Sequence, residues 1–252
     1  VADCLGEAIV DVGGGMQSLH IPAAFSKLFR SPMDWDYLTE PQKGVGGREI
    51  YWPRGKVLGG SSSMNAMMWV PGFPADYDEW GRQAGQQWDY AHLRPYFDRA
   101  ENGALVISEQ RSPRSSTALW LRAAEQAGYR SMTPDAPVLD GFCQTAVTQR
   151  RGARWSCADA YLKPVLHRRN LTLLTDSTVR RVLIGGGRAV GVEFDDADGR
   201  RQTVWADREV VLSAGAVNTP QLLMLSGIGD EKELAEYGIG VVRHAPEVGR
   251  NL

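Results

Sequence analysis

A glycine- and serine-rich segment at residues 54–69 constrains this chain more than any other part of its sequence. It reads Arg-Gly-Lys-Val-Leu-Gly-Gly-Ser-Ser-Ser-Met-Asn-Ala-Met-Met-Trp. The paired glycines Gly59 and Gly60 let the backbone approach a ligand with no Cβ in the way, and the hydroxyls and amides that follow offer donors to a phosphate or a polar ring edge. Arg54 adds a cation, and Asn65 both donates and accepts hydrogen bonds. On chemistry alone, a plain surface loop leading into a core helix fits the segment equally well.

A second small-residue segment lies at residues 213–229, where Ala214, Gly215 and Ala216 follow an apolar run. We interpret it as a buried strand, a tight turn and a helix over 220–225 that is capped by Asn218 or Thr219. That arrangement places a helix N-terminus against an anionic or electron-rich ligand. Taken alone, an ordinary strand-to-helix joint is the simpler interpretation.

Asp11 is a third feature, because it follows the short apolar run 8–10 and precedes three glycines. An acidic residue at the end of a strand often accepts hydrogen bonds from ribose hydroxyls in dinucleotide-binding folds. The signal is weak, since turns favour Asp in any case. The Gly-x-Gly-x-x-Gly pattern that normally lies some 20 residues earlier is absent from this sequence.

The remaining elements are predicted from apolar spacing and turn residues. Helices are expected over 90–101, with Asp89 as N-cap, and over 117–127, with Thr117 as N-cap and Gly128 past the end. Residues 20–60 form an extended excursion without a core layer. Residues 65–70 and 156–166 are further helix candidates, the second interrupted at Pro164. Short β-type runs follow at 171–175, 179–184, 189–194, 203–206 and 209–213. Turns rich in Gly and Asp make several of these a meander, and the mixture predicts an α/β or α+β fold.

Composition excludes several classes of protein. With 252 residues, a net charge of −2 and 43% hydrophobic residues, the chain is long enough for one large domain or two small ones. The charge argues against a nucleic-acid partner, and no apolar run reaches the roughly 20 residues of a transmembrane helix. The first residues lack a signal-peptide pattern, and three scattered cysteines suit a reducing cytosol. The four histidines show no metal spacing, so we expect a cytoplasmic protein without a metal site.

At the two glycine segments the sequence resembles the flavin-dependent glucose–methanol–choline (GMC) oxidoreductase family, most closely its choline and alcohol dehydrogenase branch. Residues 55–78 match the first family signature, Gly-Lys-x-Leu-Gly-Gly-Ser-Ser-x-Met-Asn followed by Trp69, Gly72 and Asp78, and residues 215–229 match the second. Segments between them, such as Ile-Tyr-Trp-Pro-Arg-Gly at 50–55 and Ala-Asp-Ala-Tyr-Leu at 158–162, resemble the family as well.

The resemblance implies an incomplete Rossmann-like FAD-binding domain with a β-meander, plus part of a substrate domain. Residues 1–80 and 168–252 correspond to FAD-domain segments, and 81–167 to a mostly helical excursion into the substrate domain. Family members are usually about twice this long, and their catalytic His lies near the carboxyl end. The sequence is therefore expected to be a fragment that lacks both ends and contains no catalytic residue of its own.

The function that the resemblance implies is FAD-dependent oxidation of an alcohol by hydride transfer to flavin N5, with oxygen or a quinone as electron acceptor. Three alternatives remain at this point: a catalytically inert fragment, a lyase and a photodecarboxylase of the same fold. Met64 replaces the His that carries a covalent flavin in some members, so FAD is expected to be held non-covalently. The resemblance and the features above nominate these cofactor-binding residues: Asp11, Arg54, Val57, Gly59, Gly60, Ser61, Asn65, Ala66, Met67, Met68, Val179, Ala214 and Gly215.

Overall fold

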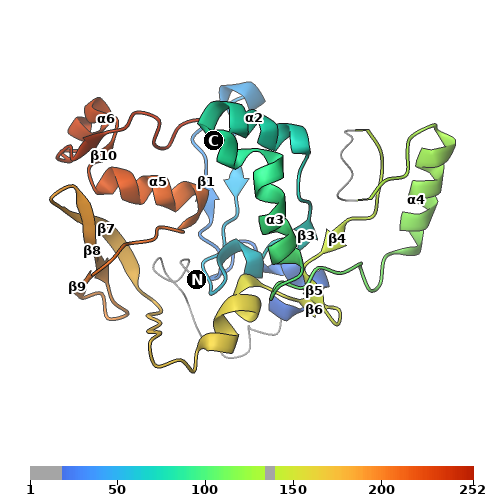
Figure 1. Ribbon diagram of the computed structural model, residues 1–252, viewed down its shortest axis with the longest axis horizontal. Helices are drawn as coiled ribbons and strands as arrows, with labels where there is room; N and C mark the ends of the chain where they lie inside the picture. The colour runs from blue at the N-terminus through green and yellow to red at the C-terminus, as the bar shows by residue number, and fades with distance from the viewer. Residues whose placement is uncertain (1–18, 134–139) are drawn as a thin grey trace. The chain divides into compact units, whose positions relative to one another are not determined.

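The computed structural model describes residues 19–133 and 140–252, which form a mixture of helices and short strands, as the sequence predicts (Figure 1). These residues divide between two compact units. One comprises Pro32–Ser61 and Leu166–Leu252, and the other comprises residues 19–31 and Ser62–Val165. The predicted strand at 8–10 and the nominated Asp11 lie outside the described residues.

A three-stranded antiparallel meander forms the largest sheet of the first unit. Its strands are β7 (Thr178–Gly185), β8 (Arg188–Asp195) and β9 (Arg201–Trp205), in the order β7-β8-β9. The turn between β7 and β8 contains two glycines with φ of +56° and +76°, which is the left-handed geometry that a two-residue hairpin requires. The predicted meander is therefore confirmed for three of its runs.

Helix α5 (Gly215–Leu225) packs against β7 and completes the apolar core of this unit. Buried Val179, Val192, Phe194 and Leu222 form one cluster, and the partly buried Val210, Leu212 and Ala214 pack against it. A buried hydroxyl joins helix to sheet: Ser226 Oγ accepts from the Val182 amide at 2.8 Å and donates to the Leu222 carbonyl at 2.5 Å. The residues that precede α5 are thereby fixed by their packing on the sheet.

Three local predictions for this unit are wrong. The runs 171–175 and 209–213 are not strands, because neither pairs with another strand in the described part of the chain. Helix α5 begins at Gly215 instead of Pro220, and its N-cap Ala214 makes no side-chain cap hydrogen bond. Asn218 lies inside the helix, where its Oδ1 accepts from the Tyr37 hydroxyl at 2.8 Å instead of capping.

The C-terminal part of this unit is a small helix–strand arrangement. Helix α5 ends before Gly227, as predicted, and Gly227 has a φ of +83°. Strand β10 (Ile228–Gly229) then pairs in parallel with β11 (Arg243–His244), and α6 (Glu231–Glu236) lies between them in sequence. The Asp230 side chain caps α6 by accepting from two of its amides.

An irregular hairpin occupies residues 33–56 of the same unit. Strands β1 (Tyr37–Leu38) and β2 (Tyr51–Trp52) are antiparallel, an isolated bridge joins Asp34 to Gly55, and the 3-10 turn η3 (Lys43–Val45) lies at the far end. Tyr51 and the amides of Asp36 and Arg54 all donate to the buried Asp34 carboxylate. A single carboxylate thus fixes the base of the hairpin, immediately before the glycine segment.

The second unit is richer in helix. Asp89 caps α3 by accepting from the His92 amide at 2.9 Å, and α3 spans the predicted residues. Helix α4 begins at Ser115 after Arg114, which makes no side-chain cap hydrogen bond, so Thr117 is not the cap; Gly128 follows the helix end, as predicted. The elements are η2 (Pro22–Leu28), β3 (Met68–Trp69), α2 (Pro74–Ala84), η5 (Gln86–Trp88), α3 (Tyr90–Glu101), α4 (Ser115–Gln126), β4 (Ala146–Val147), β5 (Gln149–Arg150), β6 (Ala153–Arg154), η6 (Ala158–Leu162) and η7 (Lys163–Val165).

Two helix predictions for this unit are wrong. Residues 65–70 contain the strand β3, which pairs antiparallel with β4, because the partner strand supplies backbone hydrogen bonds that a short helix lacks. Residues 156–166 hold one π-helical turn, η6, followed by the 3-10 turn η7, so they form no continuous α-helix; the change to η7, which contains Pro164, agrees with the interruption expected there. Among residues 19–133 and 140–252, every helix is too short or too polar to cross a membrane.

Candidate cofactor-binding site

The glycine segment of the first unit is a tight turn. The Gly60 amide donates to the Val57 carbonyl at 2.8 Å, and the Gly55 amide donates to Ser61 Oγ at 3.1 Å. Gly60 has a φ of +54°, which L side chains rarely adopt. A Cβ at Gly55 would lie 2.3 Å from the Gly60 carbonyl oxygen, so the turn folds directly back onto Gly55. The segment is therefore a compact backbone turn instead of a slack loop.

Arg54 enters this turn with a fixed side chain. Its guanidinium lies over the Trp52 ring, 4.7 Å from the centroid, and Nη1 donates to the Pro53 carbonyl at 2.7 Å. Three residues after Arg54, Val57 is buried, whereas Ser61 is exposed. The turn thus exposes Ser61 next to a base that is held by a cation–π contact and by the Asp34 carboxylate.

The turn before α5 is open at the surface. Gly215 is exposed and has a φ of +83°, and a Cβ built on it would meet nothing within 4 Å. The helix that follows has eleven residues and no side-chain cap, so its first amides point toward whatever lies in front of Ala214 and Gly215. Val179 belongs to the core cluster behind this turn, and it pairs with Phe194 of β8 in the sheet. The Tyr37–Asn218 hydrogen bond ties the hairpin to the same helix.

The Asn65–Met68 stretch belongs to the second unit and is held in an unusual conformation. Met67 has a φ of +61°, which is uncommon for a residue with a side chain and costs free energy. Asn65 Oδ1 accepts from the Met67 amide at 2.9 Å, and the Thr148 amide donates to the Met67 carbonyl at 2.8 Å. Met67 is buried, whereas the side chain of Met68 is 65% exposed. Strain of this kind is concentrated at functional sites.

A buried arginine that the sequence analysis missed also contacts this stretch. Arg154 is 1% exposed and donates hydrogen bonds to Leu19, Ser62 and Asn65. Near it lies the buried carboxylate of Asp159, which accepts from Ser156 and Lys163. Burial alone would raise the pKa of Asp159, but the hydrogen bonds from Lys163 and Ser156 outweigh it and hold that pKa below its ordinary value. No local sequence pattern marks Arg154, because its partners are distant along the chain.

The structure assigns the nominated residues to the two units separately. Arg54, Val57, Gly59, Gly60, Ser61, Val179, Ala214 and Gly215 belong to the first unit, and Asn65, Ala66, Met67 and Met68 to the second. Asp11 lies outside the described residues. Within the part of the chain that the structure describes, no group of His, Cys, Asp and Glu side chains is suited to hold a metal ion.

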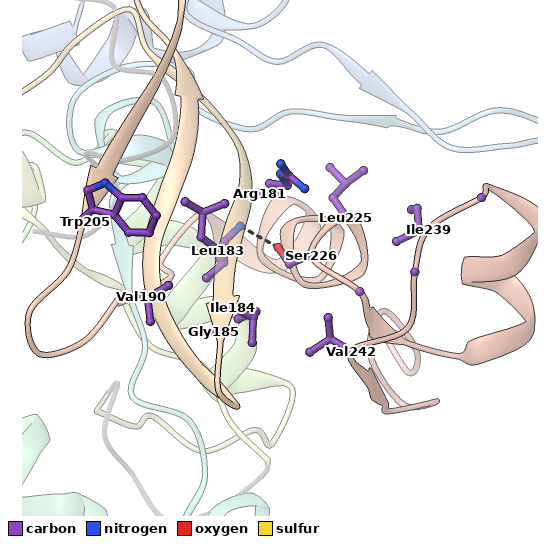
Figure 2. A pocket seen from close by; sticks show the side chains of 14 residues that line it. Arg181, Leu183, Ile184, Gly185, Val190, Trp205, Leu225, Ser226, Ile239 and Val242 are labelled. Atoms are coloured by element: carbon purple, nitrogen blue, oxygen red, sulfur yellow. Dashed lines mark hydrogen bonds between the residues drawn. The ribbon is translucent and has the colours of Figure 1, made fainter.

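A surface pocket of about 740 Å³ lies elsewhere in the first unit. Figure 2 shows its apolar walls: Ile184 and Val190 come from the sheet, Leu225 from the end of α5, and Ile239 and Val242 from the segment after α6. None of the nominated cofactor-binding residues lines it. Its lining is mostly aliphatic and lacks a cluster of donors, so it does not suit a pyrophosphate.

Comparison with known proteins identifies the class to which this fold and these turns belong. The model of the GMC oxidoreductase family matches residues 7–252. The chain belongs to the GMC oxidoreductase family, and the cofactor that this membership indicates is FAD. The resemblance that the glycine segments suggested is thus confirmed.

Two relatives illustrate the range of similarity. A GMC-type oxidoreductase of Mycobacterium tuberculosis is 62% identical over 248 residues, which cover 92% of this chain and 47% of the relative. Human mitochondrial choline dehydrogenase is 45% identical over 249 residues, covering 93% of this chain and 42% of the relative. The chain therefore spans about half the length of the curated relatives that it matches.

Solved structures agree with this assignment. Pyridoxine 4-oxidase from Mesorbium loti superimposes with a TM-score of 0.85 at 32% identity, over 96% of this chain and 50% of that chain. A formate oxidase of Aspergillus oryzae, studied for its FAD modification, gives a TM-score of 0.84 at 28% identity, over 96% of this chain and 48% of that chain. The mixed helix and strand fold is therefore that of FAD-dependent GMC oxidoreductases.

The donor set of this chain fits FAD. A pyrophosphate is bound by backbone amides and helix N-termini, and the uncapped N-terminus of α5 is a feature of this kind. Gly215 adds space, since nothing occupies the position of its missing side chain. The residues present are thus chemically suited to the cofactor that the family uses.

Proposed function

We propose that the protein carrying this chain is an FAD-dependent oxidoreductase that oxidises an alcohol. The observation that carries the proposal is the pair of glycine turns, Gly59–Gly60 and Ala214–Gly215, in a chain of the GMC oxidoreductase family. The names of the relatives support an alcohol as donor, since two of them are choline dehydrogenases of mouse and human mitochondria. Oxidation is favoured over lyase or decarboxylase chemistry by the oxidases among the structural neighbours.

In this proposal the chain supplies the cofactor site. The Gly60 turn and the first amides of α5 bind the pyrophosphate, and the Asn65–Met68 stretch contacts the flavin. The backbone of Val179 contacts the adenine, Arg54 offsets negative charge, and Asp11 accepts from the ribose. When bound, FAD supplies the hydride acceptor at N5. We assign residues 1–80 and 168–252 to the FAD domain, and residues 81–167 to a mostly helical excursion and part of the substrate domain.

The proposal places the base that takes the hydroxyl proton outside residues 1–252, as the family resemblance implies. Two of the four histidines in the described residues have local partners. His92 Nδ1 lies 2.8 Å from the carboxylate of its own N-cap, Asp89, and His244 Nδ1 accepts from the Glu231 amide at 3.3 Å. We therefore expect the isolated chain to be inactive toward alcohols, because positioned acid–base groups typically contribute a factor of about 10²–10⁴.

The test is anaerobic reduction of the full-length protein's flavin. Primary alcohols, including choline, are mixed with the oxidised protein, and the loss of visible flavin absorbance is followed by stopped-flow. Bleaching that saturates with alcohol concentration supports the proposal, and reoxidation by oxygen or by a quinone then distinguishes oxidase from dehydrogenase. A protein that binds FAD but is bleached by no alcohol, while dithionite bleaches it fully, is not an alcohol oxidoreductase.

We further predict that the FAD is held non-covalently. Met64 occupies the position of the flavin-linking histidine, and its side chain is buried. A thioether cannot form the histidyl bond. Acid precipitation of the full-length protein is expected to leave all yellow colour in the supernatant; colour that stays with the washed pellet would contradict the prediction.

A further inference from the structure

We propose that Arg154 is a positioning residue that holds the Asn65–Met67 turn in the conformation that binds the cofactor. The inference rests on the proposed function, since it assigns a role to a residue outside the glycine signatures. It concerns one unit only, because Arg154 and the residues to which it donates all belong to the second unit.

The hydrogen bonds of Arg154 converge on the segment that leads into this turn. Its Nη2 donates to the Asn65 carbonyl at 2.7 Å, and its Nη1 donates to Asn65 Oδ1 and to the Ser62 carbonyl, both at 3.0 Å. Its Nε donates to the Leu19 carbonyl at 2.8 Å. The planar guanidinium fixes the directions of its donors, so the backbone and the side chain of Asn65 are both oriented by one rigid group.

Asn65 passes this constraint to Met67. Its Oδ1 accepts from the Met67 amide as well as from Arg154, which uses both lone pairs of the amide oxygen. The Oδ1 of Asn65 therefore cannot rotate toward solvent without releasing Arg154 and Met67 together. Met67 has a φ of +61°, a conformation that persists only where surrounding contacts impose it. The contacts that impose this conformation begin at the buried guanidinium of Arg154.

A second contact holds Ser62, at the start of the segment that leads into the turn. The Cys157 amide donates to Ser62 Oγ at 2.9 Å, three residues beyond Arg154. Residues 154–157 thus hold both the carbonyl and the hydroxyl of Ser62. One short stretch of chain therefore holds the start of the turn. Asn65 and Met68 remain exposed to solvent.

Burying the charged side chain of Arg154 costs desolvation free energy. Burial lowers its pKa to about 10, and the Asp159 carboxylate acts in the opposite direction, so the guanidinium stays charged at neutral pH. Replacing buried charges by apolar residues of similar volume is often neutral or stabilising. Core packing alone therefore does not explain an arginine at this position. The need to orient the Asn65–Met67 turn does explain it.

The experiment uses the full-length protein, stripped of flavin and titrated with FAD. Arg154→Met removes every donor, and Arg154→Lys keeps the cation without the planar fork. The matched control is Arg111→Met, an exposed arginine of the same unit that donates to the Arg151 carbonyl at 2.9 Å. Three quantities are measured: the FAD dissociation constant, the visible spectrum per bound flavin and the unfolding temperature of the apoprotein.

We expect Arg154→Met to raise the FAD dissociation constant by about tenfold or more, the effect of losing one or two net hydrogen bonds. The spectrum of the flavin still bound should change shape, because a loosened turn alters the surroundings of the ring. Arg154→Lys should show a partial form of both effects, and Arg111→Met neither. A purely structural role would reduce the folded fraction and leave the spectrum of bound flavin unchanged.

Two results would overturn the inference, and they differ from failure of the proposed function. Unchanged affinity and unchanged spectrum in both Arg154 variants, with only a lower unfolding temperature, would make Arg154 a structural residue. Equal losses from the Arg154 and Arg111 variants would have the same meaning. If Arg154→Met does not fold, the same readouts on Arg154→Lys decide. A wild-type protein that binds no FAD would instead refute the proposed function.

Discussion

Two of the turns that we assign to the cofactor, one from each unit, are held by different forces. The Ala214–Gly215 turn of the first unit rests on an apolar cluster that contains Phe194 and Leu222. The Asn65–Met67 turn of the second unit is oriented by the buried guanidinium of Arg154. Apolar packing is non-directional, whereas hydrogen bonds to a charged planar group are directional. The first turn is exposed and lies over an apolar core. The second turn is strained at Met67 and is oriented by directional hydrogen bonds.

This difference predicts two kinds of failure. Loss of an apolar contact should lower the free energy of unfolding of the first unit and leave its remaining folded molecules able to bind. Loss of a directional donor should leave a folded second unit whose turn is wrongly aimed. The largest effects test the apolar side of the comparison.

Phe194→Ala is expected to have the largest effect on stability. Phe194 is 7% exposed in β8 and pairs with Val179 of β7 inside the core cluster. Truncating such a residue removes buried area and leaves a cavity, which typically costs about 3–5 kcal/mol. The control is Trp205→Ala on the adjacent strand β9, because Trp205 is 70% exposed and surface changes usually stay within about 0.5 kcal/mol. Urea unfolding measures both; similar losses would mean that the cluster is not the core.

The features that could be predicted from the sequence are those decided by neighbours along the chain. The glycines between β7 and β8 mark a hairpin turn by themselves. Asp89 caps α3 by accepting from the amide of His92, only three residues along the chain. Both glycine segments were recognised because close approach of a backbone requires glycine itself. Their conformations, with positive φ at Gly60 and Gly215, agree with that requirement.

The features that the sequence did not reveal depend on distant partners. Arg154 binds carbonyls 135 and 89 positions away, so no local pattern indicates its role. The start of α5 was misplaced because Asn218 uses its side chain on Tyr37, 181 residues away, instead of capping. The apolar run 209–213 predicts a strand, but its Val210 and Leu212 pack on the core cluster without pairing to another strand in the described residues.

The second prediction separates conformation from approach at the Gly60 turn. Gly60 and Gly186 have φ values of +54° and +56°, so an Ala at either position carries nearly the same backbone strain, on the order of 1 kcal/mol. Gly186 lies in the hairpin turn, where a Cβ would meet nothing within 4 Å. We expect Gly60→Ala to lower FAD occupancy steeply and Gly186→Ala to leave it nearly unchanged, at similar unfolding temperatures of the apoproteins.

This pair of variants is matched in φ, and the unfolding temperatures of the apoproteins show whether any other strain differs between them. Flavin absorbance per protein after gel filtration gives the occupancy. Equal loss of FAD from both variants, or from neither, would remove the Gly60 turn from the cofactor site. A loss confined to Gly60→Ala would support a backbone that touches the cofactor.

The third prediction concerns acid stability on the polar side of the comparison. The pKa of Asp159 is lowered in the folded state from its ordinary value of 3.8, because hydrogen bonds from Lys163 and Ser156 outweigh the effect of burial. A carboxylate of this kind contributes stability above its unfolded pKa and loses it as the pH falls through the folded pKa. Asp159→Asn should therefore be less stable than wild type at neutral pH, with a difference that shrinks below about pH 4. A difference that is constant from pH 7 to pH 3 would contradict this sign.

The smallest effect is expected on the exposed face of the meander. Arg201 donates to Glu193 Oε1 at 2.8 Å and to Asp195 Oδ1 at 2.6 Å, and the pKa values of both carboxylates are lowered, chiefly by hydrogen bonds from Arg181 and Arg180 respectively. The side chain of Arg201 is more than half exposed, so solvent and salt screen its ion pairs. Arg201→Gln should lower the urea midpoint slightly at low salt and not measurably at physiological salt. Any change in stability caused by Arg154→Met should be the same under both conditions, because the Arg154 side chain is buried and salt does not screen it. A salt-independent loss of stability from Arg201→Gln would mean that salt does not screen the exposed ion pairs of Arg201. The contrast between exposed and buried charges in the two units would then be wrong.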